Sequence, residues 1–258
     1  GLECKLFSRS SRGVVLTDEG RLLYDHVSEA FEALNEGEEK LKRSIELGVG
    51  QLKIGVSSTL CKYMLLPYLK EFIHRNPHIS ISIECQSTNE TLKLLDDDKI
   101  DIGLIGKPTS LKTFNFYYLD NIEDIFVTTK DYLRNLSARG VKKSEILQNS
   151  TLMLLDKGNM TRKYIDDYLQ ENQIHVKDSI DISNMDLLID FAKIGVGVAC
   201  VIKSIVSKEL ADGTLIEIPL GIPIHKREVG FAYKESSKLS TSLQTFIKFY
   251  ESYTPEDF

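Results

Sequence analysis

The sequence predicts an α/β protein in which a short β-hairpin and one long helix precede a larger domain of strands and helices. Three observations support this prediction. A polar, glycine-containing turn separates two short apolar segments within residues 1–20. A narrow apolar stripe of helical spacing then continues over residues 18–47. After Gly48-Val49-Gly50 the pattern becomes that of βαβ units, in which strands, polar loops and helices alternate.

The composition is that of an ordinary globular protein. The 258 residues are 42% hydrophobic and 27% charged, which is enough for one large or two modest domains. Because the formal net charge is −6, most of the surface should repel nucleic acid, and any contact with DNA must be local. No apolar run has the length of a membrane span and the start lacks a signal-peptide pattern, so we expect a cytoplasmic protein without membrane contact.

The residues that bind metals or perform catalysis are scattered. The four cysteines, Cys4, Cys61, Cys85 and Cys200, form no CxxC pair, and three of them lie in apolar runs. We interpret them as reduced core thiols, with redox sensing as the alternative. The five histidines lack metal-ligand spacing, and no GxSxG motif or Walker loop is present. We therefore expect no metal, no cofactor and no enzymatic activity.

The first element is a hairpin. Its apolar strands contain residues 6–7 and 14–16, and the polar segment 8–13 supplies the turn. Arg9 and Arg12 should make the tip basic. They are either a solvated basic turn or a contact to DNA phosphates or the minor groove.

The second element is a helix that starts at Thr17-Asp18-Glu19-Gly20, where Thr17 can act as the N-cap. Its apolar residues recur at intervals of three and four, and charged residues fill the other faces. The stripe consists of Leu23, Val27, Phe31, Leu34, Leu41 and Ile45. Because so narrow a stripe covers no core of its own, we expect a partner helix and therefore a dimer. The alternative is a helix that packs on its own domain.

The larger domain repeats the order strand, polar loop, helix in two series. We expect strands at 51–56, 79–84, 101–105, 125–128, 151–155, 177–182, 197–202, 215–219 and 228–233. We expect helices at 65–75, 90–96, 162–171, 186–194 and 240–253. A connector passes through residues 117–120.

Polar side chains follow several predicted strands at the point where a helix begins. They are Ser57, Ser58, Thr59, Gln86, Thr88, Asn89, Asn159, Thr161, Ser183 and Asn184, and Gly106 follows the third strand. Ligands of open α/β sheets bind beyond the carboxyl ends of the strands, where helix N-termini favour an anion. The sequence therefore predicts a site for a small anionic or polar ligand, although the same residue types also serve simply as helix caps.

Four motifs resemble the LysR family of bacterial transcription regulators, over essentially the whole chain. The first is Leu6-Phe7-x-Arg9-x-x-Arg12-x-x-x-Leu16-Thr17-x-x-Gly20. The second is Leu52-Lys53-Ile54-Gly55, followed by Ser57-Ser58-Thr59 and Leu66-Pro67. The third is Asn76-Pro77-x-Ile79 with Asp101-Ile102-Gly103-Leu104-Ile105. The fourth is Gly195-Val196-Gly197-Val198-Ala199, with Glu209-Leu210-x-x-Gly213-x-Leu215 beyond it.

The resemblance implies a domain organisation and a function. Residues 1–17 would be the wing of a winged helix-turn-helix domain and residues 18–47 a linker helix. Residues 51–258 would form a two-lobed effector domain like a type 2 periplasmic binding protein, with lobe I at 51–122 and 227–258 and lobe II at 123–226. The implied partners are DNA for the intact protein, a small-molecule effector, and further copies of the chain in a homodimer or homotetramer.

Two features depart from the family pattern. Three helices normally precede the wing, so we expect this chain to be truncated at its start. The loop after the second effector-domain strand often carries glycine, whereas this chain has Gln86-Ser87-Thr88-Asn89. An extracytoplasmic solute-binding protein of the same two-lobed design remains the alternative, although it would need a signal peptide and would leave the hairpin and long helix unexplained.

Overall fold

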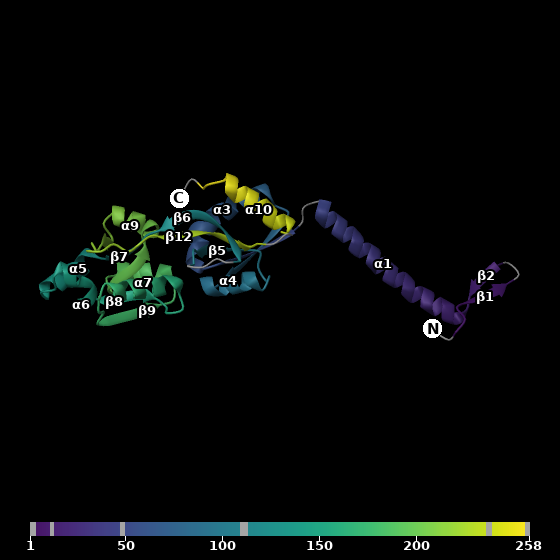
Figure 1. Ribbon diagram of the computed structural model, residues 1–258, viewed down its shortest axis with the longest axis horizontal. Helices are drawn as coiled ribbons and strands as arrows, with labels where there is room; N and C mark the ends of the chain where they lie inside the picture. Colours follow the sequence, from purple (N-terminus) through teal and green to yellow (C-terminus); the bar gives the residue numbers. More distant parts are fainter. Residues whose placement is uncertain (1–3, 11–12, 47–49, 109–112, 236–238, 256–258) are drawn as a thin grey trace. The chain divides into compact units, whose positions relative to one another are not determined.

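The computed structural model describes residues 4–10, 13–46, 50–108, 113–235 and 239–255, without the side chains of residues 10 and 40–46 (Figure 1). The chain divides into two compact units, Gly1–Gly50 and Gln51–Phe258. Each unit is described below by itself. None of the helices in the described ranges combines the length and hydrophobicity that a membrane span requires.

The first unit begins with a two-stranded antiparallel sheet of β1 (Phe7–Ser10) and β2 (Gly13–Leu16). The sequence predicts that the turn starts at Ser8, but the strand continues through Ser10. Arg9 therefore pairs with Val14 within the ladder and does not lie at the tip. Arg12, the second predicted basic residue of the tip, lies outside the described residues.

A hydrogen-bonded junction connects this hairpin to α1 (Asp18–Glu46). The Thr17 hydroxyl donates to the Lys5 carbonyl at 2.6 Å and accepts from the Gly20 N–H at 3.0 Å, which confirms the predicted cap. Gly20 is required here because a Cβ at this position would lie 1.9 Å from the Leu6 carbonyl oxygen.

The apolar stripe of α1 is exposed on the single chain. Phe31 and Leu34 are 62% and 68% exposed, Val27 is also exposed, and Leu23 is half-buried. The side chains of Leu41 and Ile45 lie outside the described part of the structure. The described residues of this unit therefore leave the apolar face of α1 uncovered.

The second unit contains two five-stranded mixed sheets, each with helices packed against it. We call the part built on the order β4-β3-β5-β12-β6 lobe I and the part built on β11-β7-β10-β8-β9 lobe II. The strands of lobe I are β3 (Gly50–Val56), β4 (Ile79–Cys85), β5 (Ile102–Gly106), β6 (Phe114–Ile122) and β12 (Arg227–Lys234). Those of lobe II are β7 (Asp124–Thr128), β8 (Thr151–Leu155), β9 (Asp178–Ile182), β10 (Val198–Ile202) and β11 (Ile216–Glu217).

The helices follow the strands in βα order. In lobe I they are α2 (Ser58–Leu60), the π-helix η1 (Cys61–Leu65), α3 (Leu66–Arg75), α4 (Thr88–Asp96) and α10 (Thr241–Ser252). In lobe II they are α5 (Lys130–Ala138), η2 (Lys143–Glu145), α6 (Ile146–Asn149), α7 (Met160–Glu171), α8 (Met185–Lys193), η3 (Lys203–Val206) and α9 (Ser207–Ala211). Parallel pairs β3–β5 and β8–β9 bring strand ends and helix starts to the same edge of each sheet.

Two predictions about this unit are wrong in their detail. The predicted connector at 117–120 is part of strand β6, an edge strand whose residues are mostly half-buried or exposed. The helix predicted from Leu65 is preceded by α2 and η1, so the chain turns helical directly after Ser57. The helices α5, α6 and α9 are additional to the predicted set.

The aromatic core of lobe I is built by α3, β12 and the C-terminal helix α10. Phe72 and Phe246 meet edge to face at 4.9 Å between ring centroids, and Phe231 stacks on Tyr250 at 4.6 Å. All four side chains are at least 98% buried. Burial of this aromatic cluster packs the C-terminal helix α10 against β12, the strand of lobe I that follows lobe II in the chain.

The expectation that the cysteines are core thiols holds only for Cys200, which is buried in β10. Cys4 and Cys85 are exposed and Cys61 is half-buried. Cys85 ends the edge strand β4, where an apolar run no longer implies burial. Burial and the neighbouring Cys85 thiol raise the pKa of Cys61.

Candidate functional site

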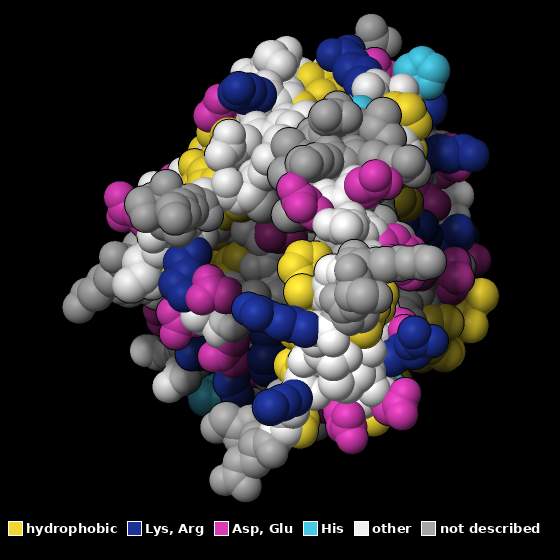
Figure 2. Space-filling model, turned by 90° about the vertical axis from the view of Figure 1, so that its right-hand side faces the viewer, with side chains coloured by type: hydrophobic (Ala, Val, Ile, Leu, Met, Phe, Trp, Pro, Cys, Tyr) yellow, Lys and Arg dark blue, Asp and Glu magenta, His cyan; other side chains and the backbone are white. Residues whose placement is uncertain are grey.

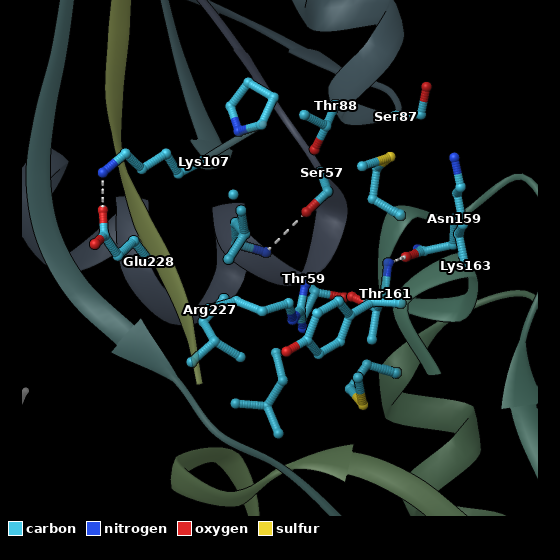
Figure 3. A pocket seen from close by; sticks show the side chains of 18 of the residues that line it. Ser57, Thr59, Ser87, Thr88, Lys107, Asn159, Thr161, Lys163, Arg227 and Glu228 are labelled. Atoms are coloured by element: carbon cyan, nitrogen blue, oxygen red, sulfur yellow. Dashed lines mark hydrogen bonds and ion pairs between the residues drawn. The ribbon is translucent and has the colours of Figure 1, made fainter. Parts of the chain in front are cut away.

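A cavity of about 430 Å³ lies between the two lobes (Figure 3). Lobe I contributes the segments after β3, β4 and β5, and lobe II contributes the start of α7. The lining residues with polar side chains are Ser57, Thr59, Ser87, Thr88, Lys107, Asn159, Thr161, Lys163, Tyr164, Asp167, Lys226, Arg227 and Glu228. Mostly polar side chains around such a space indicate a site for a polar ligand.

On the lobe I side, the hydroxyl groups also cap helices. The Ser57 Oγ accepts from the Leu60 N–H at 3.3 Å, and Ser87 forms a capping box with Glu90 at the start of α4. Thr59 has no hydrogen-bond partner among the described residues, so its hydroxyl is available to a ligand. The helix starts add partial positive charge to this wall.

On the lobe II side, the wall is the first turns of α7. Asn159 is the N-cap, and its Oδ1 accepts from the Thr161 N–H at 2.8 Å. Arg162 points away from the cavity and is buried, where it donates to the Leu155 carbonyl and to Asp181. This buried arginine ties α7 to β8 and β9 and so sets the position of the wall.

The cavity has an excess of positive charge. Four cations line it, Lys107, Lys163, Lys226 and Arg227, against the two acids Asp167 and Glu228. Lys107 pairs with Glu228 and Lys226 with Glu123, whereas Lys163 has no ion pair in the described chain. On the face shown in Figure 2, by contrast, basic and acidic side chains are interspersed. The excess charge of the cavity is therefore opposite in sign to the net charge of the protein, which is −6.

The chain crosses between the lobes twice, and an ion pair joins the crossings. Arg227 lies opposite Ile122 in the ladder, and its guanidinium donates to Asp124 at 2.8 Å from Nε and 3.0 Å from Nη2. Burial raises the pKa of Asp124, while the charge of Arg227 and its hydrogen bonds act in the opposite direction. The guanidinium also lies 5.2 Å from the ring centroid of Tyr164 on α7.

The structure brings six of the eleven predicted effector residues together. Ser57, Thr59, Thr88, Gly106, Asn159 and Thr161 all line the cavity. The other five predicted residues do not line this cavity. Ser58, Asn89 and Ser183 are exposed elsewhere, Gln86 donates to Thr91 at 3.3 Å, and Asn184 caps α8 through the Leu187 N–H.

The prediction also missed residues that the structure places in the site. The most important are Lys163, Tyr164 and Arg227. Tyr164 lies one turn into α7, beyond the loop that the pattern singles out. Arg227 opens β12 and depends on Asp124, which is 103 residues earlier in the chain, so no local signal identifies it.

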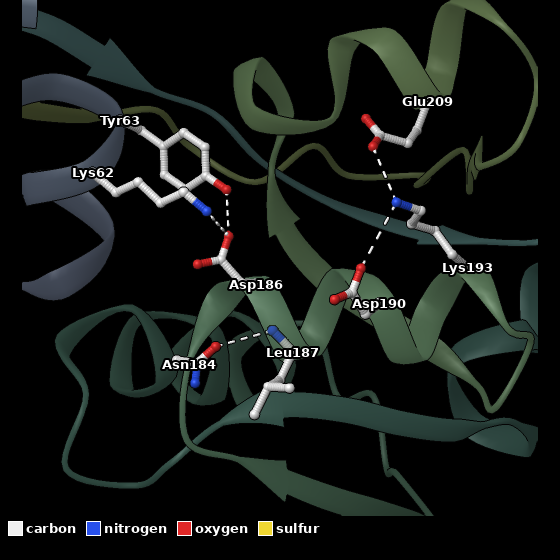
Figure 4. A network of polar contacts seen from close by, with 8 residues as sticks. All are labelled: Lys62, Tyr63, Asn184, Asp186, Leu187, Asp190, Lys193 and Glu209. Atoms are coloured by element: carbon white, nitrogen blue, oxygen red, sulfur yellow. Dashed lines mark hydrogen bonds and ion pairs between the residues drawn. The ribbon is translucent and has the colours of Figure 1, made fainter.

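A second polar network also joins the lobes (Figure 4). Lys62 and Tyr63 on η1 both contact Asp186 Oδ1, at 2.6 Å from Lys62 Nζ and 2.5 Å from Tyr63 Oη. Asp186 lies in the first turn of α8, whose N-cap is Asn184. Hydrogen bonds from Lys62 and then Tyr63 lower the pKa of Asp186. This contact holds η1 of lobe I against α8 of lobe II.

The family model described as "LysR substrate binding domain" matches residues 46–254. Among curated relatives, the HTH-type transcriptional regulator YeiE of Escherichia coli is 24% identical over 249 residues, which cover 96% of this chain and 82% of YeiE. The HTH-type transcriptional activator CmpR of Synechocystis is 24% identical over 250 residues, which cover 95% of this chain and 79% of CmpR.

Solved structures of similar fold include regulatory domains and longer chains. The Synechocystis CcmR regulatory domain in complex with 2-PG gives a TM-score of 0.65 at 19% identity, covering 78% of this chain and 95% of that one. A full-length variant of AphB gives 0.65 at 19% identity, covering 98% and 85%. At these identities the likeness concerns the fold, and it confirms the predicted two-lobed α/β class with its preceding hairpin and helix.

Replacing Asp186 by Asn tests the contact between η1 and α8. Because the folded protein lowers the pKa of Asp186 below its ordinary 3.8, the contact stabilises the fold above that pH and is broken as the pH falls through the lowered pKa. Asp186→Asn should therefore reduce the free energy of unfolding by urea at pH 7. The difference from the unsubstituted chain should disappear below the lowered pKa of the folded protein.

Asp190→Asn is the matched control, because Asp190 lies on the same helix and its nearest cation is Lys193 in the same lobe, at 3.7 Å. A loss of stability by Asp186→Asn that is equal at neutral and acid pH would show that the ion pair is not its cause.

Proposed function

This chain belongs to the LysR family of transcription regulators, and we propose that it responds to a small anionic metabolite bound in the cavity between its lobes. The observation that carries the proposal is the lining of that cavity, where hydroxyl groups, helix starts and an excess of cations converge. A small anion would satisfy these groups together. Solved relatives of the fold hold small molecules, 2-PG in CcmR and shikimate in QuiR, which supports a ligand here.

In this proposal the parts of the chain have separate roles. Residues 1–17 are the wing, residues 18–47 the linker helix, and residues 51–258 the effector domain, with lobe I at 51–122 and 227–258 and lobe II at 123–226. The two sheets are composed of strands from these two sets of residues, which supports the division. We infer that this chain has no catalytic activity and that, as a transcription regulator, it acts in the cytoplasm.

The effector would act by changing the relative positions of the lobes. A ligand that contacts Thr59 on lobe I and Thr161 on lobe II binds best at one separation of the two walls. It therefore shifts the lobes toward that separation by its difference in affinity. In a dimer or tetramer this shift changes the geometry of the assembly and with it the contact to DNA.

The cavity is tested by alanine substitutions at two adjacent hydroxyls. A screen of carboxylate, sulfate and phosphate metabolites by thermal shift first identifies a stabilising compound. Thr59→Ala should then weaken binding of that compound by about 1.5–3 kcal/mol, as expected for a hydrogen bond to a charged group. Isothermal titration gives the value.

Ser58→Ala is the control, because the Ser58 side chain is exposed and does not line the cavity. The proposed site would be wrong if no metabolite stabilised the chain, or if the two substitutions had the same effect on affinity.

The linker helix should pair with a second copy through its exposed apolar stripe. Phe31→Lys together with Leu34→Lys should dissociate the assembly, because each places a charge among apolar side chains that a partner helix must cover. Light scattering measures the mass of both chains. Glu32→Lys, on the opposite face of α1, should leave the mass unchanged. A monomeric unsubstituted chain would contradict pairing through this stripe.

Arg9 is the described basic residue of the hairpin, and we propose that it contacts a DNA phosphate. In a protein that also carries the three helices expected before the hairpin, Arg9→Ala should weaken binding to DNA. The dependence of log K on log salt should flatten by about 0.9 for each phosphate that the protein no longer neutralises. A salt slope identical to that of the unsubstituted protein would exclude this role of Arg9.

A further inference from the structure

Arg227 is the cation of the cavity whose side chain is held most firmly. It is 15% exposed, and the Asp124 side chain behind it is fully buried. The Nε and Nη2 groups donate to the two carboxylate oxygens of Asp124, with the shortest contact, from Nη2 to Oδ2, at 2.7 Å. The aromatic ring of Tyr164 covers the guanidinium, and the Tyr164 hydroxyl is fixed by a hydrogen bond to the His225 carbonyl at 2.7 Å.

One edge of the guanidinium is left for a ligand. A guanidinium has five N–H donors, and Asp124 engages Nε and Nη2. The Nη1 group donates to no acceptor among the described residues. It is also not fully buried, because the described side-chain atoms that are buried without a partner do not include it. We call Nη1, together with the second N–H of Nη2, the outer edge. Arg227 lines the cavity (Figure 3), and the outer edge is the part of its guanidinium that Asp124 leaves free for a ligand there.

The surroundings give the outer edge a preference for charge. Two parallel N–H donors of a fixed guanidinium match the two oxygens of a carboxylate, sulfate or phosphate group. Asp124 and Tyr164 already hold the side chain in place, so binding would cost little side-chain entropy. The other cations of the cavity are less suited to hold an anion in one position, because lysine side chains are long and flexible. Of Lys107, Lys163 and Lys226, the first and the last are also paired with glutamates.

We propose that the outer edge of Arg227 binds the anionic group of the effector, and that Asp124 is the positioning residue that aims it. This inference rests on the proposed function and extends it, since it assigns the anionic group to a residue outside the predicted polar loops. It also places the ligand's charge at the point where the two chain crossings meet. An anion there contacts the crossings and, through Tyr164, the first turns of α7.

The test uses the full chain and two probes, inorganic phosphate and inorganic sulfate, titrated at constant ionic strength with chloride as the balancing anion. Binding is followed by isothermal titration and by the shift in unfolding temperature. The unsubstituted chain should bind at least one probe saturably. Arg227→Gln should weaken that binding by about tenfold or more, because it removes a charge-assisted bidentate contact.

Lys203→Gln is the matched control. Lys203 pairs with Glu123 and Glu217 beside the crossings but does not line the cavity. Lys203→Gln removes the same unit of charge as Arg227→Gln. If the loss of one positive charge has little effect by itself, the affinity for the probes should stay within about twofold of that of the unsubstituted chain. An equal loss in both variants would overturn the assignment to Arg227.

A second variant separates binding from folding, because Arg227→Gln leaves the buried Asp124 without a cation. In the double variant Arg227→Gln with Asp124→Asn, no buried charge remains and two amides can hydrogen-bond in its place. This protein should unfold cooperatively and still lack the response to phosphate and sulfate. Asp124→Asn alone keeps the guanidinium and should retain part of the affinity.

The inference would be overturned by a double variant that binds the probes as the unsubstituted chain does, or by an unsubstituted chain that binds neither probe. Neither result decides the proposed function, because a metabolite could still bind elsewhere in the cavity, and Thr59→Ala tests that separately. If the Thr59→Ala test failed and Arg227 still bound the probes, the cavity would contain an anion site, but no effector would be identified.

Discussion

The described chain passes from one lobe to the other at residues 122–124 and again at 226–227, and the buried Arg227–Asp124 pair binds these two crossings together. Removing one partner of such a pair typically costs about 3–5 kcal/mol, because a charge is left buried without compensation. An apolar pair of the same volume could be equally stable, so stability alone does not explain the presence of these charges. The charges add a fixed orientation of the two crossings, because a bidentate contact between them has one geometry.

That orientation brings the helix starts of the two lobes to one cavity. The same side chains serve two purposes there, because Ser57, Ser87 and Asn159 must satisfy the first N–H groups of their helices before they can meet a ligand. Their free hydrogen-bonding capacity is therefore smaller than the count of polar residues implies. Thr59, Lys163 and the outer edge of Arg227 are less committed and offer more to a ligand.

The sequence predicts the fold well where the signal is local. The alternation of strands and helices, the cap at Thr17 and the order of polar loops all follow from neighbouring residues. The edge strand β6 is not predicted, because most of its residues are half-buried or exposed and its apolar residues do not alternate regularly with polar ones. Short helices such as α9 have too few residues for a periodic pattern.

The site is predictable to a lesser extent, for a related reason. A loop after a strand can be recognised from the pattern, but whether its side chains turn toward the cavity depends on packing. Gln86 turns to Thr91 and Asn184 caps its own helix, although both stand at the expected positions. Arg227 lies at the start of a strand and not in a loop that follows one, and only the fold places Asp124 behind it.

The cavity and the contact of Asp186 with Lys62 and Tyr63 both span the two lobes, so they report on the same motion. Any ligand that changes the separation of the lobes must also strengthen or weaken the Asp186 contact, and the reverse holds by the same free energy. The helix that carries Asp186 exposes Leu187 and Phe191, and Ile194 at its C-cap is exposed as well. A movement of α8 relative to lobe I would therefore carry this apolar surface with it.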